Sequence, residues 1–413
     1  MRDDTEREEL FTARPIEQSL ENMLAKVRAA DPAGAVADYI PELAKADPEL
    51  LGISAVTLSG RAYGAGDRAA RFTIQSISKP FVYALALAEL GMDTMLERIG
   101  VEPSGQAFNA ISFDERGRPA NPLINAGAVV TTSLIGGRDA EERFERIRAG
   151  LSAFAGRELD PDDSVYRSES STGDRNRALA ALARSFGVLG SSVDDATEAY
   201  FRQCALLVDT SDLALMGATL ANNGVNPITG QRVVEATIAR NALSVMTSCG
   251  MYDRSGEWLF KVGMPAKSGV GGGIVAVAPG QYGIGVFSPP LDQAGNSSRG
   301  VLALETLSDQ FGLHMYNHQN HPASPVQEIT LDAATGTVVV RVRGTVDFVA
   351  AEILIQASIS ALRDASAHAL VLDLANVTAI GPIAGRLIDD LAREATKLDY
   401  RVTVIDPEGL LAV

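Results

Sequence analysis

The sequence predicts an α+β protein of two domains, in which an antiparallel sheet with a helical lobe comes first and a small α/β domain with a mixed sheet follows. Three patterns lead to this prediction. Short β-prone runs occur near both ends of the first domain, helical periodicity fills the stretch between them, and strands alternate with helices in the last part of the chain. With 413 residues, the chain can form more than one hydrophobic core. We expect domains at 1–316 and 326–413, joined by a linker at 317–325.

The N-terminal part contains the signals of a helix and then of a hairpin. Apolar residues recur at spacings of three and four over 20–27, which is the pattern of a helix, and Pro32 follows. Two short β-prone runs, 53–58 and 61–63, flank a Ser-Gly turn. We therefore expect a helix followed by an antiparallel strand pair.

Helical patterns then dominate up to about residue 250. We expect helices at 81–90, 140–151, 175–186, 193–208 and 211–222. Beyond Pro265 the pattern returns to strands: runs at 274–277 and 282–287 flank a Pro-Gly turn, and a helix follows at 301–313. One sheet assembled from both ends of the domain would leave the helices as an inserted lobe, with the active site in the cleft between lobe and sheet.

A polar, proline-bounded stretch precedes the second domain and is typical of a linker. After it we expect strands at 337–342, 369–374 and 401–405, and helices at about 348–362 and 382–397. Strands that alternate with helices in this way are typical of a small α/β domain.

Composition excludes several classes of protein. The chain has 36 Lys and Arg against 52 Asp and Glu, a net charge of −16, so on average it repels nucleic-acid phosphates and anionic membranes. No apolar run approaches the roughly 20 residues that span a bilayer. The first ten residues are acidic, whereas a secretory signal is basic and then apolar. We expect a cytoplasmic protein with no nucleic-acid partner and no membrane span.

The cysteines and histidines limit the chemistry further. Cys204 and Cys249 form no C-x-x-C motif, and we expect both to be small buried apolar residues. All four histidines lie at or beyond His314, so a Ser-His-Asp triad or a histidine-ligated metal within the first 313 residues is excluded. His314, His318 and His321 lie in a polar stretch without thiolates, which indicates a linker rather than a zinc site. We expect no metal and no cofactor.

The stretch FTIQSISKP at 72–80 carries the main chemical signal. Ser76 and Lys79 form an S-x-x-K pair, and at the start of a helix this spacing puts both side chains on one face. A lysine amine kept neutral by burial can remove the proton from a serine hydroxyl and so make it a nucleophile. The motif K-S-G follows at 267–269, and this combination is the pattern of penicillin-binding proteins and serine β-lactamases. Together the two motifs predict an acyl-transfer site.

Further motifs resemble those of one family. They are ADYIP at 37–41, NPLINAG at 121–127, SE at 168–169, RN at 175–176, YFRQC at 200–204, SCGMY at 248–252, AKSGVGGGI at 266–274 and SPPLDQAGNSSRG at 288–300. In order and spacing, the chain from about residue 18 to 316 resembles the serine-dependent glutaminases of the β-lactamase-like fold. The resemblance implies hydrolysis of the side-chain amide of L-glutamine to glutamate and ammonia, by a homo-oligomer (dimer or tetramer).

The resemblance also implies roles in catalysis. Ser76 would attack the amide carbon while Lys79 takes its proton, and the backbone N–H groups of Ser76 and Val270 would form the oxyanion hole. Water would then hydrolyse the γ-glutamyl ester, with Tyr200 or Lys79 as proton carrier. The implied catalytic residues are Ser76, Lys79, Tyr200, Tyr252 and Val270.

A larger set matches the substrate pocket of the family. The implied substrate-binding residues are Tyr39, Ser76, Asn125, Glu169, Asn176, Tyr200, Tyr252 and Val270. Glu169 would pair with the α-ammonium group of the substrate. Taken singly, each could instead be a helix cap, a solvated acid or a core residue, but they occur together at the spacing of the family. For Lys267 two interpretations stay open: it biases the local charge, or it holds the strand.

The C-terminal part, 326–413, resembles the STAS domain of sulfate transporters and anti-sigma-factor antagonists, most clearly over 370–388. In the antagonists, the turn before the helix carries Asp-Ser-Ser/Thr-Gly with a phosphorylated hydroxyl. The aligned residues here, 381–384, are Gly-Pro-Ile-Ala and carry no hydroxyl. We therefore expect a module for protein contact or assembly, or one that senses a small ligand, rather than a phosphorylation switch.

Two alternatives to a glutaminase stay open at this stage. One is a serine acyl hydrolase of the β-lactamase or peptidase type, for which an extracytoplasmic signal would be expected. The other is a non-catalytic regulator in which the first domain senses a ligand. The pair of Ser76 and Lys79 argues against the regulator, because a sensor needs neither a nucleophile nor a base.

Overall fold

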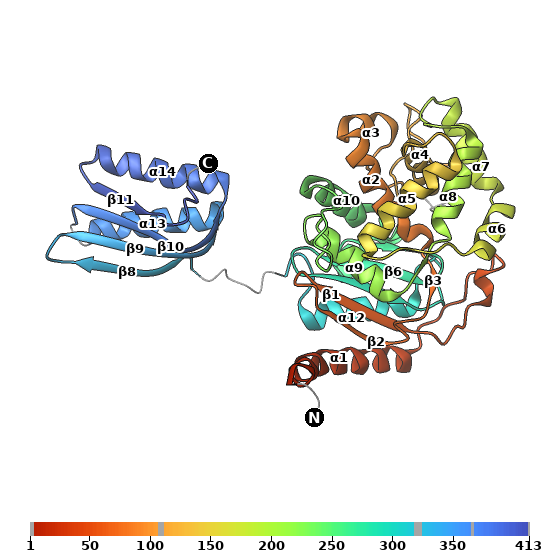
Figure 1. The fold of residues 1–413 in the computed structure, drawn as a ribbon, viewed down its shortest axis with the longest axis horizontal. Helices are drawn as coiled ribbons and strands as arrows, with labels where there is room; N and C mark the ends of the chain where they lie inside the picture. Colours follow the sequence, from red (N-terminus) through yellow and green to blue (C-terminus); the bar gives the residue numbers. More distant parts are fainter. Residues whose placement is uncertain (1–3, 106–110, 318–323, 365–366, 412–413) are drawn as a thin grey trace. The chain divides into compact units, whose positions relative to one another are not determined.

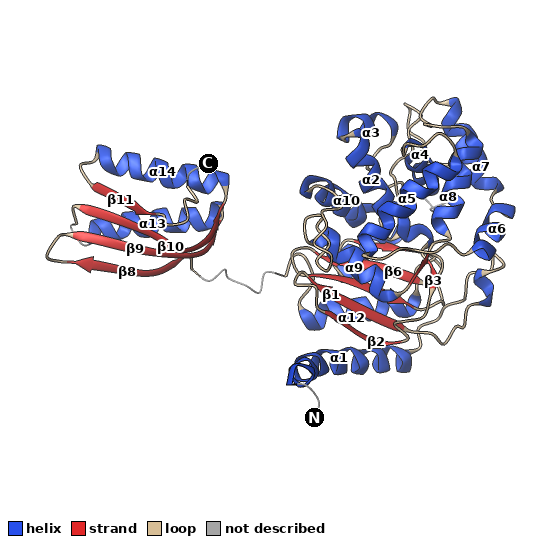
Figure 2. Cartoon of the chain, viewed as in Figure 1, coloured by secondary structure: helices blue, strands red, loops and turns tan. Residues whose placement is uncertain are grey.

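The computed structural model describes residues 4–105, 111–317, 324–364 and 367–411. The chain forms two compact units, Met1–Asn317 and His318–Val413. Each unit contains both helices and strands (Figures 1 and 2). Most of the linker predicted for 317–325 lies outside the described residues. None of the helices within the described ranges is long and apolar enough to cross a bilayer.

A five-stranded antiparallel sheet forms the centre of the first unit. Its strands are β1 (Gly52–Thr57), β2 (Ala62–Gly66), β5 (Ala266–Ser268), β6 (Gly273–Ala278) and β7 (Tyr282–Phe287). Their order in the sheet is β2-β1-β7-β6-β5, and Ala55 of β1 pairs with Ile284 of β7. The predicted sheet from both ends of the domain is therefore confirmed.

Helices cover both faces of this sheet. On one face, α9 (Thr210–Ala221) packs against β1, β6 and β7; on the other face lie α1 (Asp4–Ala30) and α12 (Ser298–Phe311). Gly283 permits the close approach of α9, since a Cβ atom there would lie 1.9 Å from the backbone nitrogen of Ala218. Both faces of the central strands are consequently buried.

The helical lobe lies between β2 and β5 in the sequence. Besides α9, its helices are α2 (Ser78–Leu90), α3 (Met92–Arg98), α4 (Asn125–Leu134), α5 (Ala140–Ala155), α6 (Asp163–Ser171), α7 (Asp174–Ser185), α8 (Val193–Cys204), α10 (Ala236–Cys249) and α11 (Ser255–Lys261). Phe81, Phe144 and Phe154 are fully buried in its core. The predicted helices are present, but α3, α4, α6, α10 and α11 were not predicted.

One predicted helix, 193–208, was too long. It ends at Cys204, and Leu207–Val208 form the short strand β4, which pairs with β3 (Phe72–Thr73). The backbone nitrogen of Ile74 also donates to the carbonyl of Leu206 at 2.8 Å. Pairing with a distant segment has overridden the local helical pattern, as tertiary contacts often do.

The second unit is an α/β unit with a four-stranded mixed sheet. Its elements are β8 (Val326–Asp332), β9 (Thr337–Val346), α13 (Phe348–Asp364), β10 (Ala369–Ile380), α14 (Pro382–Lys397) and β11 (Arg401–Ile405). The order is β11-β10-β9-β8, with β8 antiparallel to β9 and the other pairs parallel. The mixed sheet was predicted. Strand β8 was missed because it is an edge strand whose Ile329 and Leu331 stay largely exposed.

Candidate active site

Ser76 lies in a tight turn between β3 and α2. This turn contacts β5 and β6 of the sheet as well as α2 and α8, so it lies at the boundary of the sheet and the lobe. The turn is a 3-10 helix, Gln75–Ile77, and Ser76 is 7% exposed within it. Gln75 has a φ of +49°, in the left-handed region that residues other than glycine rarely adopt. Ser76 therefore lies in the 3-10 turn, two residues before α2 begins. The S-x-x-K spacing had suggested instead that Ser76 opens the α-helix itself.

Lys79 is buried in the first turn of α2 and is only 1% exposed. Its Nζ donates to Asn125 Oδ1 at 2.7 Å and to the carbonyl of Leu123 at 3.3 Å. Burial lowers the pKa of Lys79 to about 8. A neutral amine has two N–H groups, which these two acceptors satisfy, and its lone pair stays available to accept a proton.

A second buried lysine, Lys267, lies on the edge strand β5. Its Nζ donates to the carbonyl of Ser268 at 2.5 Å and lies 4.2 Å from the centre of the Tyr252 ring. Burial, and then the charge of Lys79, hold the pKa of Lys267 well below its ordinary value. Tyr252 in turn hydrogen-bonds to Ser76 and donates to the carbonyl of Ser268 at 3.2 Å. Tyr252 thus joins the serine to the edge strand.

Glu169 is a buried carboxyl group on α6, 7% exposed. Burial raises its pKa to about 7, against the opposing effects of a hydrogen bond from Gln75 and the charge of Lys79. The Gln75 Nε2 donates to Glu169 Oε2 at 3.3 Å. The residue next to Ser76 in the chain therefore also holds this carboxyl group.

Helix α8 contributes Tyr200 and Cys204, one turn apart and both buried. The Cys204 thiol hydrogen-bonds to Tyr200 and to Glu169, and burial raises its pKa. Sequence reasoning treated Cys204 as an apolar residue and gave Gln75 no role. The available signals were the four-residue spacing from Tyr200 to Cys204 and the position of Gln75 directly before the serine.

The remaining predicted site residues differ in how closely they contact the buried residues around Ser76. Asn125 begins α4, and its Nδ2 donates to Asn176 Oδ1 at 3.0 Å, so one asparagine connects Lys79 with Asn176. Val270 is buried in the turn between β5 and β6. Tyr39 is 52% exposed and has Tyr252 and Glu169 within electrostatic reach. It is the most exposed of the predicted site residues.

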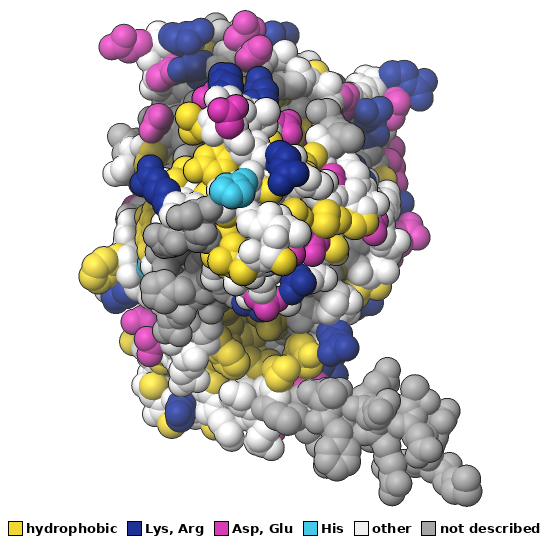
Figure 3. Space-filling model, turned by 90° about the vertical axis from the view of Figure 1, so that its left-hand side faces the viewer, with side chains coloured by type: hydrophobic (Ala, Val, Ile, Leu, Met, Phe, Trp, Pro, Cys, Tyr) yellow, Lys and Arg dark blue, Asp and Glu magenta, His cyan; other side chains and the backbone are white. Residues whose placement is uncertain are grey.

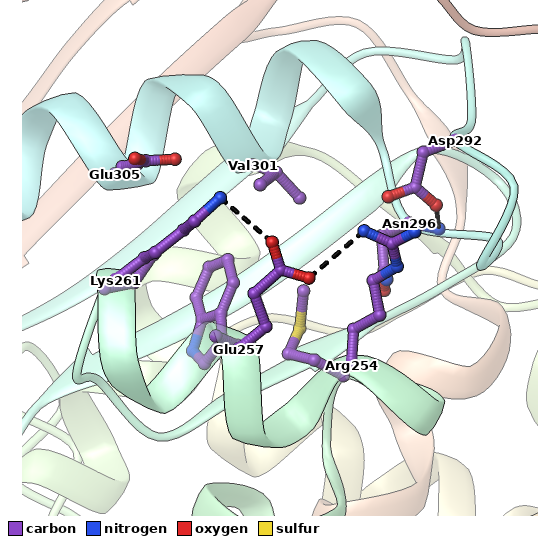
Figure 4. A pocket seen from close by; sticks show the side chains of 10 residues that line it. Arg254, Glu257, Lys261, Asp292, Asn296, Val301 and Glu305 are labelled. Atoms are coloured by element: carbon purple, nitrogen blue, oxygen red, sulfur yellow. Dashed lines mark hydrogen bonds and ion pairs between the residues drawn. The ribbon is translucent and has the colours of Figure 1, made fainter.

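Two cavities adjoin these residues, and a third lies apart from them. One of about 350 Å³ is bordered by Leu123 and Tyr252, and another of about 280 Å³ by Thr73 and Val270. A smaller pocket of about 50 Å³ lies beside α11 and α12, where Glu257 bridges Arg254 and Lys261 (Figure 4); it contains none of the predicted site residues. Within the described ranges, no group of His, Cys, Asp or Glu side chains could hold a metal ion.

The fold and the site together define the class of protein. An antiparallel sheet covered by a helical lobe, with a buried serine turn at their boundary and two buried lysines, is the arrangement of serine β-lactamase-like α+β proteins. A comparison with protein families makes the assignment specific: residues 34–316 match the family model described as Glutaminase. The chain belongs to the glutaminase family, which makes it an amidohydrolase acting on glutamine.

Individual relatives agree with this assignment. A glutaminase of Corynebacterium glutamicum is 43% identical over 399 residues, covering 96% of this chain and 95% of that protein. Glutaminase 2 of Bradyrhizobium diazoefficiens is 55% identical over 287 residues, 70% of this chain, which corresponds to 46% of that longer protein.

Solved structures show the same likeness. The native form of Mglu has a TM-score of 0.86 at 41% identity and covers 95% of this chain and 99% of that one. A probable glutaminase from Bacillus subtilis, complexed with 6-diazo-5-oxo-L-norleucine, has a TM-score of 0.67 at 35% identity and covers 73% of this chain and 97% of that one. The first of these comparisons includes most of both units.

Proposed function

We propose that the chain hydrolyses the side-chain amide of L-glutamine through an acyl-enzyme on Ser76, with Lys79 as the base. The observation that carries this proposal is the burial of Lys79, which lowers its pKa to about 8 beside the serine turn. Ser76 Oγ attacks the amide carbon and its proton passes to Lys79 Nζ; the C–N bond then breaks, and the proton leaves with ammonia. Water hydrolyses the γ-glutamyl ester and releases glutamate.

Other residues receive supporting roles in the proposal. The backbone N–H groups of Ser76 and Val270 hold the oxyanion, and Tyr200 or Lys79 carries the proton in deacylation. The Glu169 carboxylate, with Tyr39, Asn125, Asn176 and Tyr252, binds the amino-acid part of the substrate. A buried carboxylate supports this role, because a cationic group of the substrate compensates its charge and an analogue without that group leaves it unpaired.

For the rest of the chain we propose a glutaminase domain at 1–316 and a STAS-like domain at 326–413 that mediates protein contact or assembly. The mixed sheet and the helix α14, which follows Gly381, support the likeness. A cytoplasmic location and a homo-oligomeric state belong to the same proposal.

Ammonia release tests the mechanism. Ser76→Ala is expected to lower kcat for L-glutamine by roughly 10⁴-fold or more, because the nucleophile is lost, while circular dichroism shows an unchanged fold. 6-Diazo-5-oxo-L-norleucine should label the peptide that contains Ser76, as read by mass spectrometry. An unchanged rate in Ser76→Ala, or a label on another residue, would overturn the proposal.

A further inference from the structure

A chain of buried hydrogen bonds ends at the backbone carbonyl next to Ser76. Thr132 Oγ1 donates to Gln203 Oε1 at 2.9 Å, Gln203 Nε2 donates to Ser78 Oγ at 2.9 Å, and Ser78 Oγ donates to the carbonyl of Gln75 at 2.8 Å. Thr132, Gln203 and Ser78 are at most 1% exposed, and Gln75 is 2% exposed. We call Thr132, Gln203 and Ser78 the relay.

The relay has only one consistent direction. The Gln75 carbonyl can only accept, so Ser78 must use its single proton for that bond. Ser78 Oγ can then only accept from Gln203, which must present its NH₂ group to Ser78 and its oxygen to Thr132. The direction of each hydrogen bond therefore depends on the one before it. If Gln203 presented an acceptor to Ser78 in place of its NH₂ group, Ser78 would lose its hydrogen bond to the Gln75 carbonyl.

The carbonyl at the end of the relay belongs to the strained residue of the serine turn. Gln75 has a φ of +49°, and a residue other than glycine stays in this region only where its surroundings hold it. Its side chain is held by Thr73 and Glu169, and the relay holds its carbonyl. Because Ser76 is the next residue, the orientation of the Gln75 peptide group sets where the serine lies.

We propose that Gln203, acting through Ser78, is a positioning residue for Ser76, and that Thr132 fixes the orientation of Gln203. The relay links three helices of the site. Thr132 lies on α4, Gln203 lies on α8, and Ser78 begins α2, the helix of Lys79. This inference rests on the proposed function of Ser76 as nucleophile. It adds residues that act on the serine through the backbone and not through the substrate.

A charge change at Gln203 gives the sharpest test. In Gln203→Glu, an ionised carboxylate accepts from Ser78 and draws its proton away from the Gln75 carbonyl. A protonated carboxyl group can donate to Ser78 as the amide does. Burial raises the pKa of the introduced carboxyl group, so the protonated form dominates at the acidic end of the pH range.

The expected result is a pH-dependent loss of kcat in Gln203→Glu. The ratio of the variant kcat to that of the unchanged enzyme should fall by roughly 100-fold as pH rises through the pKa of the new carboxyl group, since small displacements of a nucleophile cost about that much. KM for L-glutamine should change less than about threefold, because none of the three relay residues is among those proposed to bind the substrate. Circular dichroism should be recorded at each pH, and kcat values compared only where the variant has the same spectrum as the unchanged enzyme.

Two neighbouring threonines of α4 supply a matched control pair. Thr132→Val removes the first donor of the relay, whereas Thr131→Val removes a buried hydroxyl that bonds within its own helix, to the carbonyl of Gly127 at 2.8 Å. We expect a lower kcat for Thr132→Val, by about 3- to 10-fold, and an unchanged kcat for Thr131→Val.

The outcomes separate the two proposals. If Ser76→Ala abolishes activity but the kcat ratio of Gln203→Glu is flat with pH, or if both threonine variants behave alike, the positioning role is wrong and the serine mechanism stands. If Ser76→Ala keeps its activity, the proposed function itself fails, whatever the relay variants show.

Discussion

At the scale of single residues, burial makes the site reactive. Lys79 and Lys267 are both almost fully buried, and the loss of water disfavours their charged forms. Repulsion by the positive charge of Lys79 lowers the pKa of Lys267 further. An ordinary surface lysine stays protonated at neutral pH, whereas Lys79 is partly neutral there. A lysine can therefore take the role that histidine has in other serine hydrolases.

This burial predicts the pH dependence of kcat/KM. Only neutral Lys79 can accept the proton of Ser76, and the neutral fraction grows as pH rises through about 8. We therefore expect kcat/KM to rise by up to tenfold per pH unit between pH 7 and 8 and to level off above pH 8. Below pH 7 the rise should be steeper, because the Glu169 carboxyl group, proposed to bind the substrate as a carboxylate, is then protonated as well. Initial rates of ammonia release between pH 6 and about pH 9.5 measure this profile.

A substitution at the same residue supplies the control for that profile. Lys79→Arg keeps the positive charge but cannot lose its proton, so it should be inactive across the whole range. If the Lys79→Arg variant instead had the same pH profile as the unchanged enzyme, another group would be the base.

At the scale of elements, close packing between α9 and the sheet positions the lobe over the serine turn. The contact depends on glycines in β7, because a side chain at Gly283 would collide with the backbone of α9. Hydrophobic residues on both sides of the sheet complete two separate core clusters. The fit is steric, and its partners are more than 60 residues apart in the chain.

The packing of Gly283 gives a stability prediction. Gly283→Ala should lower the free energy of unfolding by about 3 kcal/mol or more, since the new methyl group would lie 1.9 Å from a backbone atom. Gly256→Ala is the matched control: it lies in helix α11 with no atom within 4 Å of the added Cβ, and should be neutral or slightly stabilising. Chemical denaturation compares the two, and equal stability would contradict the steric argument.

At the scale of the whole molecule, the two units have separate hydrophobic cores. Leu313 is the last residue of the hydrophobic clusters in the first unit. The cluster of the second unit starts at Val338, with Val326 packed against it. Among the described side chains on the face in Figure 3, acidic and basic groups are interspersed and form no broad basic area of the kind that binds nucleic acid. The overall charge of −16 agrees with that distribution.

Separate cores predict that the first unit works without the second. A chain that ends at Asn317 should retain kcat/KM for L-glutamine within about threefold, because every residue proposed for the site lies before that point. Ammonia release and the elution volume on size exclusion should be measured for both chain lengths. A large loss of activity together with a change in elution would show instead that the second unit is required for an active assembly.

The sequence by itself determined the family, the sheet built from both ends of the first unit, and the residue types of the site. These follow from local signals, namely motif spacing, turn pairs and alternation, which any reader of the chain can see. The strand β4 and the helices α4 and α6 could not be predicted from the sequence, because their formation depends on pairing and packing with distant segments.

Only the tertiary structure decided which side chains act on one another. It buried Lys79 and so lowered its pKa, brought Cys204 to Glu169, and joined Thr132 to the carbonyl before Ser76. Desolvation and hydrogen bonding depend on what surrounds a group in space, and residues far apart in the chain supply those surroundings.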